Sequence, residues 1–550
     1  MTRVRAGIAG VVAVMFAVAT TEFVLGLLPG AGSLFIAVGD VVIEATPGPV
    51  VQVAIDAFGS ANRLVLLVSM TIVMAAAGAV IGVLGLRRPV VVPVGFAAFG
   101  VAGALAGLGD VAITTTSALL ATAAGVVAGA AVLHRILQVI TPGTMRETAT
   151  SVPATAANNG GQSSTGYPSS VAIVDRSPAT SDPAPDTSDR SWDEAMATRR
   201  RFLTWTAATA GAAGVLLATG RFLQDRAAAS VARVTTALPS PSRPLPPPPA
   251  GASLDVEGIS PLLTPNEDFY RIDTAFSIPR IDADTHRIRI TGMVDQPFEI
   301  SFAELLDLAD TEVDVTLSCV SNQVGGDLIG TARWLGVPLA DILDRAGVQA
   351  GADQIVGRSV DGWTGGFPVE AAFDGRPAII AVGMNGEPLP PRHGFPVRLV
   401  IAGLYGYVSD TKWLSEIELT TFDAFDAYWV PRGWSAEGPI KIQSRIDVPR
   451  ANSSVDVGTV AVAGVAWSDE RGVSAVEVSI DDGPWERAEL ADELASTTWR
   501  QWLYRWEATA GDHVLRVRAS DADGQPQTAD VSAPAPDGAT GHHTIRIGVT

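Results

Sequence analysis

Residues 313–339 read VDVTLSCVSNQVGGDLIGTARWLGVPL and contain Cys319, the only cysteine of this 550-residue chain. The β-rich run VDVTLS predicts a strand that ends at the thiol and leads into an irregular, glycine-containing loop. A buried cysteine is most often a small, inert hydrophobic residue. A strand end followed by polar, glycine-rich backbone is also where chains hold ligands, and a thiolate is the ligand that soft-binding metal centres select. This context favours Cys319 as a metal ligand.

Two blocks of sequence resemble one enzyme family. Cys319-Val-Ser-Asn322, followed by GTARWLGVP at 330–338, resembles the metal-ligand loop of the sulfite oxidase family of molybdopterin enzymes. In that family one cysteine sulfur bonds molybdenum and a pterin dithiolene supplies two more sulfurs. The second block, HGFPVRLVIAGLYGYVSDTKW at 393–413, resembles the family's pterin-phosphate segment. The blocks occur in family order, and the resemblance runs from residue 262 to the C-terminus.

Length and composition exclude some partners. At 550 residues the chain is too long for one domain. It carries 38 Lys and Arg against 58 Asp and Glu, a net charge of -20, so nucleic acid is not an expected partner. The single cysteine excludes an intrachain disulfide. Hydrophobic residues make up 47% of the chain, which predicts membrane segments.

Residues 1–140 predict a transmembrane bundle, because crossing a hydrocarbon core of about 30 Å takes roughly 20 apolar residues in a helix. Four segments qualify: 7–28, 64–86, 90–109 and 111–133. Residues 34–58 are nearly as apolar but contain acidic side chains and a Pro-Gly-Pro break, so we expect an interfacial or re-entrant segment there. With four spans, the basic residues at the segment ends all face the cytoplasm.

Residues 141–198 are rich in Ser, Thr, Ala, Pro and Asp, which predicts a disordered cytoplasmic linker. Residues 199–224 predict a further transmembrane helix with a basic start, and TRRRFLT at 198–204 also resembles a twin-arginine export signal. Because this helix would run from inside to outside, all later residues are expected outside the cytoplasm. Residues 225–252 include PSPSRPLPPPP, a stiff proline-rich linker.

Two domains are expected after this linker. Residues 253–447 mix predicted strands and short helices without a βαβ rhythm, which indicates an α+β domain. Residues 448–550 alternate apolar and polar residues between glycine-containing turns, the pattern of an immunoglobulin-like β-sandwich. The sulfite oxidase family carries such a domain at this place, often as its dimer contact, so the resemblance leaves a homodimer through this domain open.

The resemblance also implies a set of cofactor-binding residues. His393, Arg398 and Lys412 would clamp the cofactor phosphate, since a dianionic group needs fixed donors, Arg as a fork and Lys as a point charge. Without the resemblance, the same residues would be charges that flank a buried strand. The other implied cofactor contacts are Asn266, Tyr270, Ser321, Asn322, Thr331, Ala332 and Arg333.

Several positions around the implied metal depart from the family pattern. The implied catalytic residues are Cys319, Arg271, Arg432 and Trp434. Trp434 stands where sulfite oxidases carry a catalytic tyrosine, and Gln323 and Val324 stand where two arginines follow the metal cysteine. Sulfite is a small dianion that needs several positive donors. These departures favour reduction of a small-molecule or protein-borne S- or N-oxide, while Asn266 either faces the metal or only shapes a turn after Pro265.

The source of electrons is expected outside the chain. The predicted spans hold only His134, at one end, and no Cys-x-x-Cys-His motif occurs, so we expect no haem in this chain. A separate cytochrome or quinone would then exchange electrons with the molybdenum cofactor. Two alternatives remain open: a sulfite dehydrogenase, and a catalytically dead membrane-tethered scaffold or adhesion protein.

Overall fold

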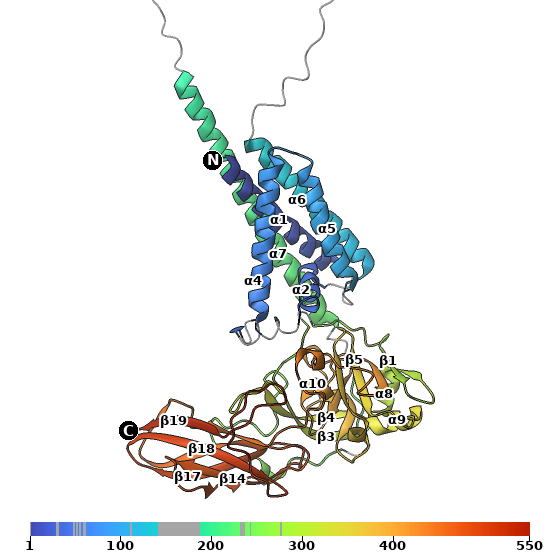
Figure 1. Ribbon diagram of the computed structural model, residues 1–550, viewed down its shortest axis with the longest axis vertical. Coiled ribbons are helices and arrows are strands. Elements are labelled where there is room, and N and C mark those ends of the chain that lie inside the picture. Colours follow the sequence, from blue (N-terminus) through green and yellow to red (C-terminus); the bar gives the residue numbers. More distant parts are fainter. Residues whose placement is uncertain are drawn as a thin grey trace, which may run out of the picture. The chain divides into compact units, whose positions relative to one another are not determined.

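The computed structural model describes residues 2–28, 32–47, 50, 53, 57–58, 62–109, 113–140, 187–231, 237–242, 244–275 and 278–550 (Figure 1). The chain divides into two compact units. The first comprises Met1–Pro29, Leu64–Leu105 and Thr115–Phe222. The second comprises Gly30–Arg63, Ala106–Thr114 and Leu223–Thr550. Each unit is described separately below.

The first unit is helical. Its helices are α1 (Thr2–Leu27), α4 (Asn62–Gly85), α5 (Val91–Gly109), α6 (Thr115–Ile140) and α7 (Thr187–Val231). Within the described residues, these five contain segments long and apolar enough to cross a membrane. The helix α2 (Leu34–Glu44), which belongs to the second unit, has 11 residues, about 16 Å, and is too short to cross a core of about 30 Å.

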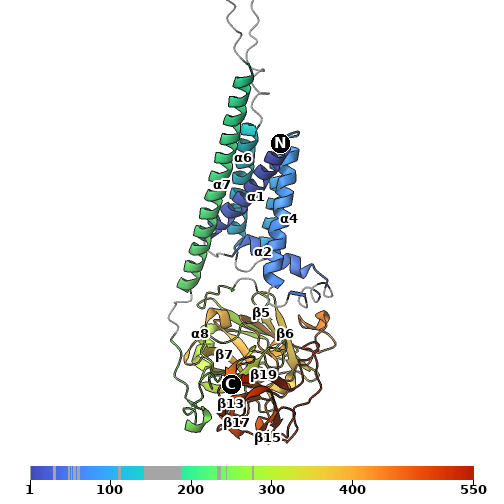
Figure 2. The same ribbon diagram turned by 90° about the vertical axis from the view of Figure 1, so that its left-hand side faces the viewer.

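Small residues bring the helices of this unit close together. Figures 1 and 2 show α1 beside α6 and α4. A Cβ atom added at Gly10 of α1 would overlap the carbonyl of Gly78 in α4, and one added at Gly125 of α6 would overlap the Thr21 hydroxyl. Close backbone approach through glycine is how helices pack in lipid, where no hydrophobic force drives their association.

The helix α7 is longer than the sequence predicts. It begins at Thr187, inside the segment expected to be a linker, and ends at Val231, so it has 45 residues instead of about 26. Residues 187–198 contain no proline or glycine, the two residue types that most disfavour a helix interior. Residues 141–186, the remainder of that predicted linker, lie outside the described residues.

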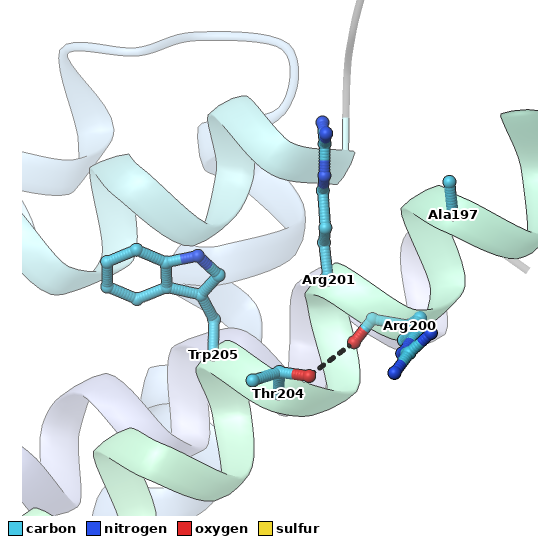
Figure 3. Close-up of a pocket in the computed structure, with 5 residues that line it drawn as sticks. All are labelled: Ala197, Arg200, Arg201, Thr204 and Trp205. Atoms are coloured by element: carbon cyan, nitrogen blue, oxygen red, sulfur yellow. Dashed lines mark hydrogen bonds between the residues drawn. The ribbon is translucent and has the colours of Figure 1, made fainter.

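The basic run lies on α7 itself. A shallow hollow of about 260 Å³ is lined by Ala197, Arg200, Arg201, Thr204 and Trp205 (Figure 3). Thr204 Oγ1 donates to the carbonyl of Arg200 at 2.9 Å, so the hydroxyl is satisfied within the helix. Arginine and tryptophan at the end of an apolar helix are typical of a membrane–water interface.

The second unit contains two sheets in its first part, one mixed and one antiparallel. One has the order β2-β1-β10-β5-β6, and the other has β3-β4-β7-β8 with β9 paired to β7. The strands are β1 (Arg287–Gly292), β2 (Phe298–Ser301), β3 (Thr311–Ser318), β4 (Ile329–Pro338), β5 (Gln354–Ser359), β6 (Thr364–Pro368), β7 (Ala378–Met384), β8 (Glu387–Pro388), β9 (Arg398–Ile401) and β10 (Leu414–Thr420).

Short helices separate these strands, as expected of an α+β region. They are α8 (Phe302–Leu308), α9 (Leu339–Ala346) and α10 (Gly406–Ser409). A capping box begins α8: Ser301 Oγ accepts from Glu304 N at 3.2 Å, and the Glu304 carboxylate accepts from Ser301 N at 2.8 Å.

The C-terminal part of this unit is β-rich and forms two sheets, β11-β13-β17-β16 and β12-β19-β18-β14-β15. The strands are β11 (Gln443–Val448), β12 (Ser454–Val455), β13 (Gly458–Trp467), β14 (Val473–Ile480), β15 (Glu486–Arg487), β16 (Glu489–Leu490), β17 (Arg500–Ala508), β18 (Gly511–Asp521) and β19 (His543–Val549). Both sheets contribute to one buried core, which includes Val462 and Trp502 from the first and Leu515 and Ile547 from the second.

The C-terminal region and the α+β region are joined by a continuous core. Val465, Trp467 and Trp499 belong to the same buried cluster as Leu399 and Ile417 of the α+β region. The Trp499 indole donates to the carbonyl of Leu262 at 2.8 Å, and the Trp499 backbone N–H donates to Thr316 Oγ1 at 2.7 Å. The two regions therefore support each other's conformation.

The proline-rich segment lies along the α+β region. Ser242 Oγ donates to Asp310 at 2.8 Å, and Leu245 N donates to Glu312 at 2.8 Å. The Arg333 guanidinium donates to the carbonyls of Leu245 and Pro246 at 3.4 and 3.1 Å. This part of the predicted spacer is thus anchored by hydrogen bonds, because a polyproline backbone leaves its carbonyls free to accept them.

Candidate active site

Cys319 directly follows β3 and opens a closed loop that ends where β4 begins. Its N–H donates to the carbonyl of Leu328 at 3.0 Å, and its own carbonyl accepts from Asn322 N at 3.0 Å. Asn322 Oδ1 accepts from Leu328 N at 3.0 Å. These bonds fix the loop at the place where the thiol leaves the strand.

The Cys319 thiol is 8% exposed and lies 2.8 Å from the Ser321 hydroxyl. Burial raises the pKa of Cys319, and the hydrogen bond from Ser321 opposes that shift. A buried thiol held in this way is protonated by itself and needs a metal cation to become a thiolate.

Arg398, at the start of β9, is a buried cation. Its side chain is 3% exposed, and its guanidinium lies over the Trp334 ring at 4.9 Å. One terminal nitrogen donates to the carbonyl of His393 at 3.2 Å, and the other lies 3.8 Å from the carboxylate of Asp410. Burial lowers the pKa of Arg398 and the Asp410 carboxylate raises it. The positive charge is retained because an acid and an aromatic face lie beside it.

His393 is neutral in this structure. It lies in a short 3-10 helix (Pro391–His393), with Nε2 2.9 Å from the carbonyl of Asn266. Burial lowers the pKa of His393 to about 3. Because the carbonyl can only accept, Nε2 carries the proton and Nδ1 is left as an acceptor. His393 therefore offers a hydrogen-bond acceptor at Nδ1, and its place in the predicted phosphate clamp stays a prediction.

Lys412 and Arg271 share one acid. Lys412 Nζ lies 2.9 Å from the carbonyl of Ile272 and 3.3 Å from Asp273 Oδ2. Arg271 Nε donates to the same Asp273 oxygen at 2.8 Å. Burial lowers the pKa of Lys412 to about 8, and Asp273 opposes that shift. Asp273 thus compensates the positive charge of both basic residues.

Tyr270 is influenced electrostatically by residues of both sequence blocks. It is half-buried and stacks on Phe269 with ring centroids 5.3 Å apart. Burial raises the pKa of Tyr270 well above its usual value, and the charges of Asp410 and Cys319 raise it further, while Arg398 lowers it. The phenol is therefore neutral and lies within electrostatic reach of groups from both blocks.

Some predicted residues have partners away from Cys319. Along β4, alternate side chains point to opposite faces. Trp334 and Ala332 share one face and are buried in one cluster, whereas Thr331 bonds the hydroxyl of Thr316 on the other face. Arg333, also on that other face, donates to both Asp314 oxygens at 2.9 and 2.8 Å. Thr331 and Arg333 consequently stabilise the β3–β4 pair and are left out of the proposed site.

The side chains of the remaining predicted residues have other partners, although the Asn266 carbonyl also accepts from His393 Nε2. Asn266 donates to the carbonyl of Met384 at 3.3 Å and accepts from Asn385 at 2.9 Å, at the β7–β8 turn. The Arg432 guanidinium lies 3.7 Å from the centroid of the Tyr428 ring. Trp434 packs on Tyr407 and Trp429, with ring centroids 5.9 and 6.3 Å away. Arg432 and Trp434 thus belong to an aromatic cluster within the segment 428–434 and its neighbours.

Three residues of the site were not singled out from the sequence. Asp410 is buried beside Arg398, and burial raises its pKa to about 6. Tyr405 is 2% exposed, and burial together with the nearby Cys319 raises its pKa to about 12. Asp273 compensates Lys412. All three lie within or beside the segments that resemble the family, and for Asp273 and Asp410 an acidic residue two positions from a predicted cation was the available signal.

Buried polar atoms test whether these residues fit a bound cofactor. Among the buried polar atoms that have no hydrogen-bond partner in the described residues, Asn322 Nδ2, His393 Nδ1 and Asp410 Oδ2 belong to the two sequence blocks. An unsatisfied buried polar atom costs about 1–3 kcal/mol, so such atoms gathered in two neighbouring blocks indicate a polar ligand. A pterin, which has both donors and acceptors, and a metal that needs a soft ligand fit this set of residues.

Comparison with known proteins points to the same chemistry. The sequence model of the family described as oxidoreductase molybdopterin binding domain matches residues 275–429. The mitochondrial sulfite oxidase of Homo sapiens is 30% identical over 321 residues, 50% of this chain and 58% of that protein. The uncharacterized oxidoreductase YuiH of Bacillus subtilis (strain 168) is 32% identical over 151 residues, 28% of this chain and 73% of that protein.

Among solved structures, the sulfane dehydrogenase SoxCD from Paracoccus pantotrophus aligns with a TM-score of 0.46 at 22% identity, and the match covers 52% of this chain and 81% of that one. The chain spans less than two thirds of the length of the mitochondrial sulfite oxidases it matches, 58% for the human protein.

Proposed function

The chain belongs to the sulfite oxidase family of molybdopterin oxidoreductases, and we propose that it is a membrane-anchored member that transfers an oxygen atom in a two-electron reaction. It is a molybdenum-cofactor oxidoreductase. The proposal adds that the molybdopterin-binding region lies outside the cytoplasm. It also adds a substrate class, neutral S- or N-oxides, which the enzyme would reduce.

Cys319 would supply the protein sulfur ligand to molybdenum. Arg398 and Lys412 would face the cofactor phosphate, and His393 Nδ1, Asn322 Nδ2 and Tyr270 would hydrogen-bond its polar edges. When bound, molybdopterin supplies a metal that changes oxidation state by two electrons while oxygen passes between substrate and water. The chain itself holds the ligand sulfur in a closed loop, keeps Tyr270 protonated and keeps a buried cation at Arg398.

The pairing of each nearby cation with an acid supports a neutral substrate. Arg398 lies beside Asp410, while Lys412 and Arg271 both contact Asp273. Gln323 and Val324 add no positive charge to the loop after Cys319. Arg398 and Lys412 are assigned to the cofactor phosphate, so Arg271 is the cation assigned to a substrate, and Asp273 compensates its charge. A neutral oxide needs only one or two hydrogen bonds to its oxygen. The acid partners therefore favour oxide reduction.

Sulfite oxidation is the second candidate. The relatives that match about half of this chain are named sulfite oxidases. Either reaction would exchange electrons with a separate partner, a cytochrome or a quinone.

The membrane anchor is proposed from the five apolar helices. With basic residues on the cytoplasmic side, residues after 249 lie outside the cytoplasm. We also propose that the β-rich C-terminal region is immunoglobulin-like, and that it provides a homodimer contact.

Both substrate candidates can be tested on one preparation. Purified full-length chain is analysed for molybdenum and assayed for methionine sulfoxide reduction and for sulfite oxidation with artificial electron donors and acceptors. We expect one molybdenum per chain and the larger kcat/KM, normalised to metal, for the oxide. A tenfold larger value for sulfite would overturn the substrate class, and a chain that never binds molybdenum would favour the scaffold alternative.

A further inference from the structure

We propose that the C-terminal region fixes the conformation of the loop 319–328, so that Arg445 and His543 are positioning residues for the sulfur ligand. The proposal rests on the proposed function only in taking Cys319 as the metal ligand. The region would then act within its own chain as a support of the active site, in addition to any dimer contact.

Arg445, on β11, reaches the far side of the loop. One terminal nitrogen donates to the carbonyl of Gly326 at 2.7 Å, and the other donates to Ser260 Oγ at 2.7 Å. Its Nε donates to Asp447 at 2.6 Å, and Asp447 also accepts from Ser260 N at 2.9 Å. The side chain is only 11% exposed. All three guanidinium nitrogens are bonded and the group is rigid, so Arg445 fixes the position of the Gly326 carbonyl.

His543, the first residue of β19, holds the neighbouring position. Gly325 has φ +78, a backbone conformation that favours glycine, and a Cβ atom there would overlap the His543 ring. The ring is itself fixed, since His543 Nδ1 accepts from Ile446 N at 3.0 Å. The loop tip therefore lies directly against a side chain that β11 and β19 hold in place.

The strand before the loop is held by the same region. Thr316 N donates to the carbonyl of Thr497 at 3.0 Å, and Thr497 Oγ1 donates to the carbonyl of Asp314 at 2.8 Å. The C-terminal region thus contacts β3 just before Cys319 and the loop just after it. The hydrogen bond from Cys319 N to Leu328 O closes the loop into a short ring of backbone. A displacement of Gly326 in this ring would therefore also displace Cys319 and its sulfur.

The loop has room to move if these contacts are lost. Beside it lies a hollow of about 340 Å³. Its lining includes Gly325, Asp327, Arg445, Arg450 and His543. Backbone that borders open space opens locally at low cost unless specific bonds hold it. From the C-terminal side, Arg445 supplies such a bond to Gly326, and the His543 ring supplies a steric contact at Gly325.

The single cysteine makes this testable without measuring catalysis. In the cofactor-free full chain, maleimide can label only Cys319, and the labelling rate reports opening of the loop. In the molybdenum-loaded full chain, hydrogen exchange of the peptide 319–328 reports the same motion. Arg445→Met should accelerate both by about tenfold, the effect of losing one charge-assisted hydrogen bond on a local opening equilibrium. Arg445→Lys, which keeps the charge beside Asp447, should lie between Met and the parent.

Arg500 provides a matched control. It also donates to two backbone carbonyls, those of Ala491 and Val473 at 2.7 and 3.1 Å, but both lie inside the C-terminal region. Arg500→Met should leave labelling and exchange at 319–328 unchanged even where it lowers the melting temperature. Equal acceleration in Arg445→Met and Arg500→Met, or none in either, would overturn the proposal.

A second pair of variants tests the proposal if Arg445→Met does not fold. His543→Ala should accelerate labelling about threefold by removing the ring against Gly325, whereas His542→Ala, whose ring bonds Gln527, should not. Parent-like labelling in His543→Ala would count against the proposal. Faster labelling in a chain that binds no molybdenum would keep the positioning role and remove the metal function. A variant that binds molybdenum but shows unchanged labelling would keep the metal function and remove the positioning role.

Discussion

The Asp273 carboxylate lies 3.3 Å from Lys412 Nζ, and both side chains are largely buried, at 6% and 12% exposure. The same carboxylate bonds Arg271 at 2.8 Å. One acid therefore balances two of the basic residues that the family resemblance assigns to a phosphate and an anionic substrate. Asp273 therefore lowers the net positive charge that a bound ligand would encounter beside Lys412 and Arg271.

Asp273→Asn should increase the preference for anions. Removing the carboxylate leaves Lys412 and Arg271 uncompensated, so sulfite kcat/KM should rise relative to oxide reduction by about tenfold, one charge-assisted interaction. Steady-state kinetics on metal-normalised protein measures the ratio. Asp374→Asn, which breaks the Arg376 pair, is the control and should not change it. An unchanged ratio in Asp273→Asn would contradict charge compensation.

Cys319→Ser should abolish turnover while leaving the fold intact. A hydroxyl is close in size to the thiol but is a poor ligand for a soft metal. We expect the absorption and electron paramagnetic resonance spectra of the metal to change and the melting temperature to stay near that of the parent. Ser321→Ala, which removes only the 2.8 Å contact to the sulfur, should retain molybdenum. Full activity of the serine variant would remove the ligand assignment.

Arg398→Met should destabilise the chain and reduce cofactor content. It leaves Asp410 buried beside an apolar side chain, and breaking one partner of a buried pair costs about 3–5 kcal/mol. The double variant Arg398→Met with Asp410→Asn should regain part of this free energy of unfolding, measured in urea, because the uncompensated charge is gone. Equal stability of the single and double variants would show that Asp410 is not coupled to Arg398.

His543 should make the chain less stable in acid. Burial and Arg445 lower its pKa to about 4 from an ordinary value of about 6.5. Between these values the unfolded state binds the proton and the folded state does not, so stability is lost as pH falls from about 6.5 to 4. His543→Gln should lose about 1–2 kcal/mol less over this window in urea unfolding. A parallel decline in both proteins would contradict the shift.

Membrane topology can be tested with fusions. A reporter after Pro249 should behave as extracytoplasmic, and one near Ser163 as cytoplasmic, because basic residues flank the proposed inner ends of the helices. The opposite result at either site would break the proposed orientation.

The sequence alone determined the elements that depend on local patterns. Apolar runs of about 20 residues marked α1, α4, α5 and α6, since helix length and composition are local properties. A β-rich run marked β3, and alternation between glycine-containing turns marked the β-rich C-terminal region. The run around Cys319 marked the loop that follows β3 because a strand end and a glycine-rich loop are adjacent in sequence.

Only the tertiary structure decided which charges meet. Asp273 and Lys412 are 139 residues apart, and Arg445 and Gly326 are 119 apart, so no local pattern connects them. Side-chain direction also depended on pairing: the register of β3 against β4 turned Arg333 toward Asp314 and Trp334 toward Arg398. Local composition specifies where helices and strands form, whereas long-range packing specifies the electrostatic partners of a site, because those partners come from segments that meet only when the core closes.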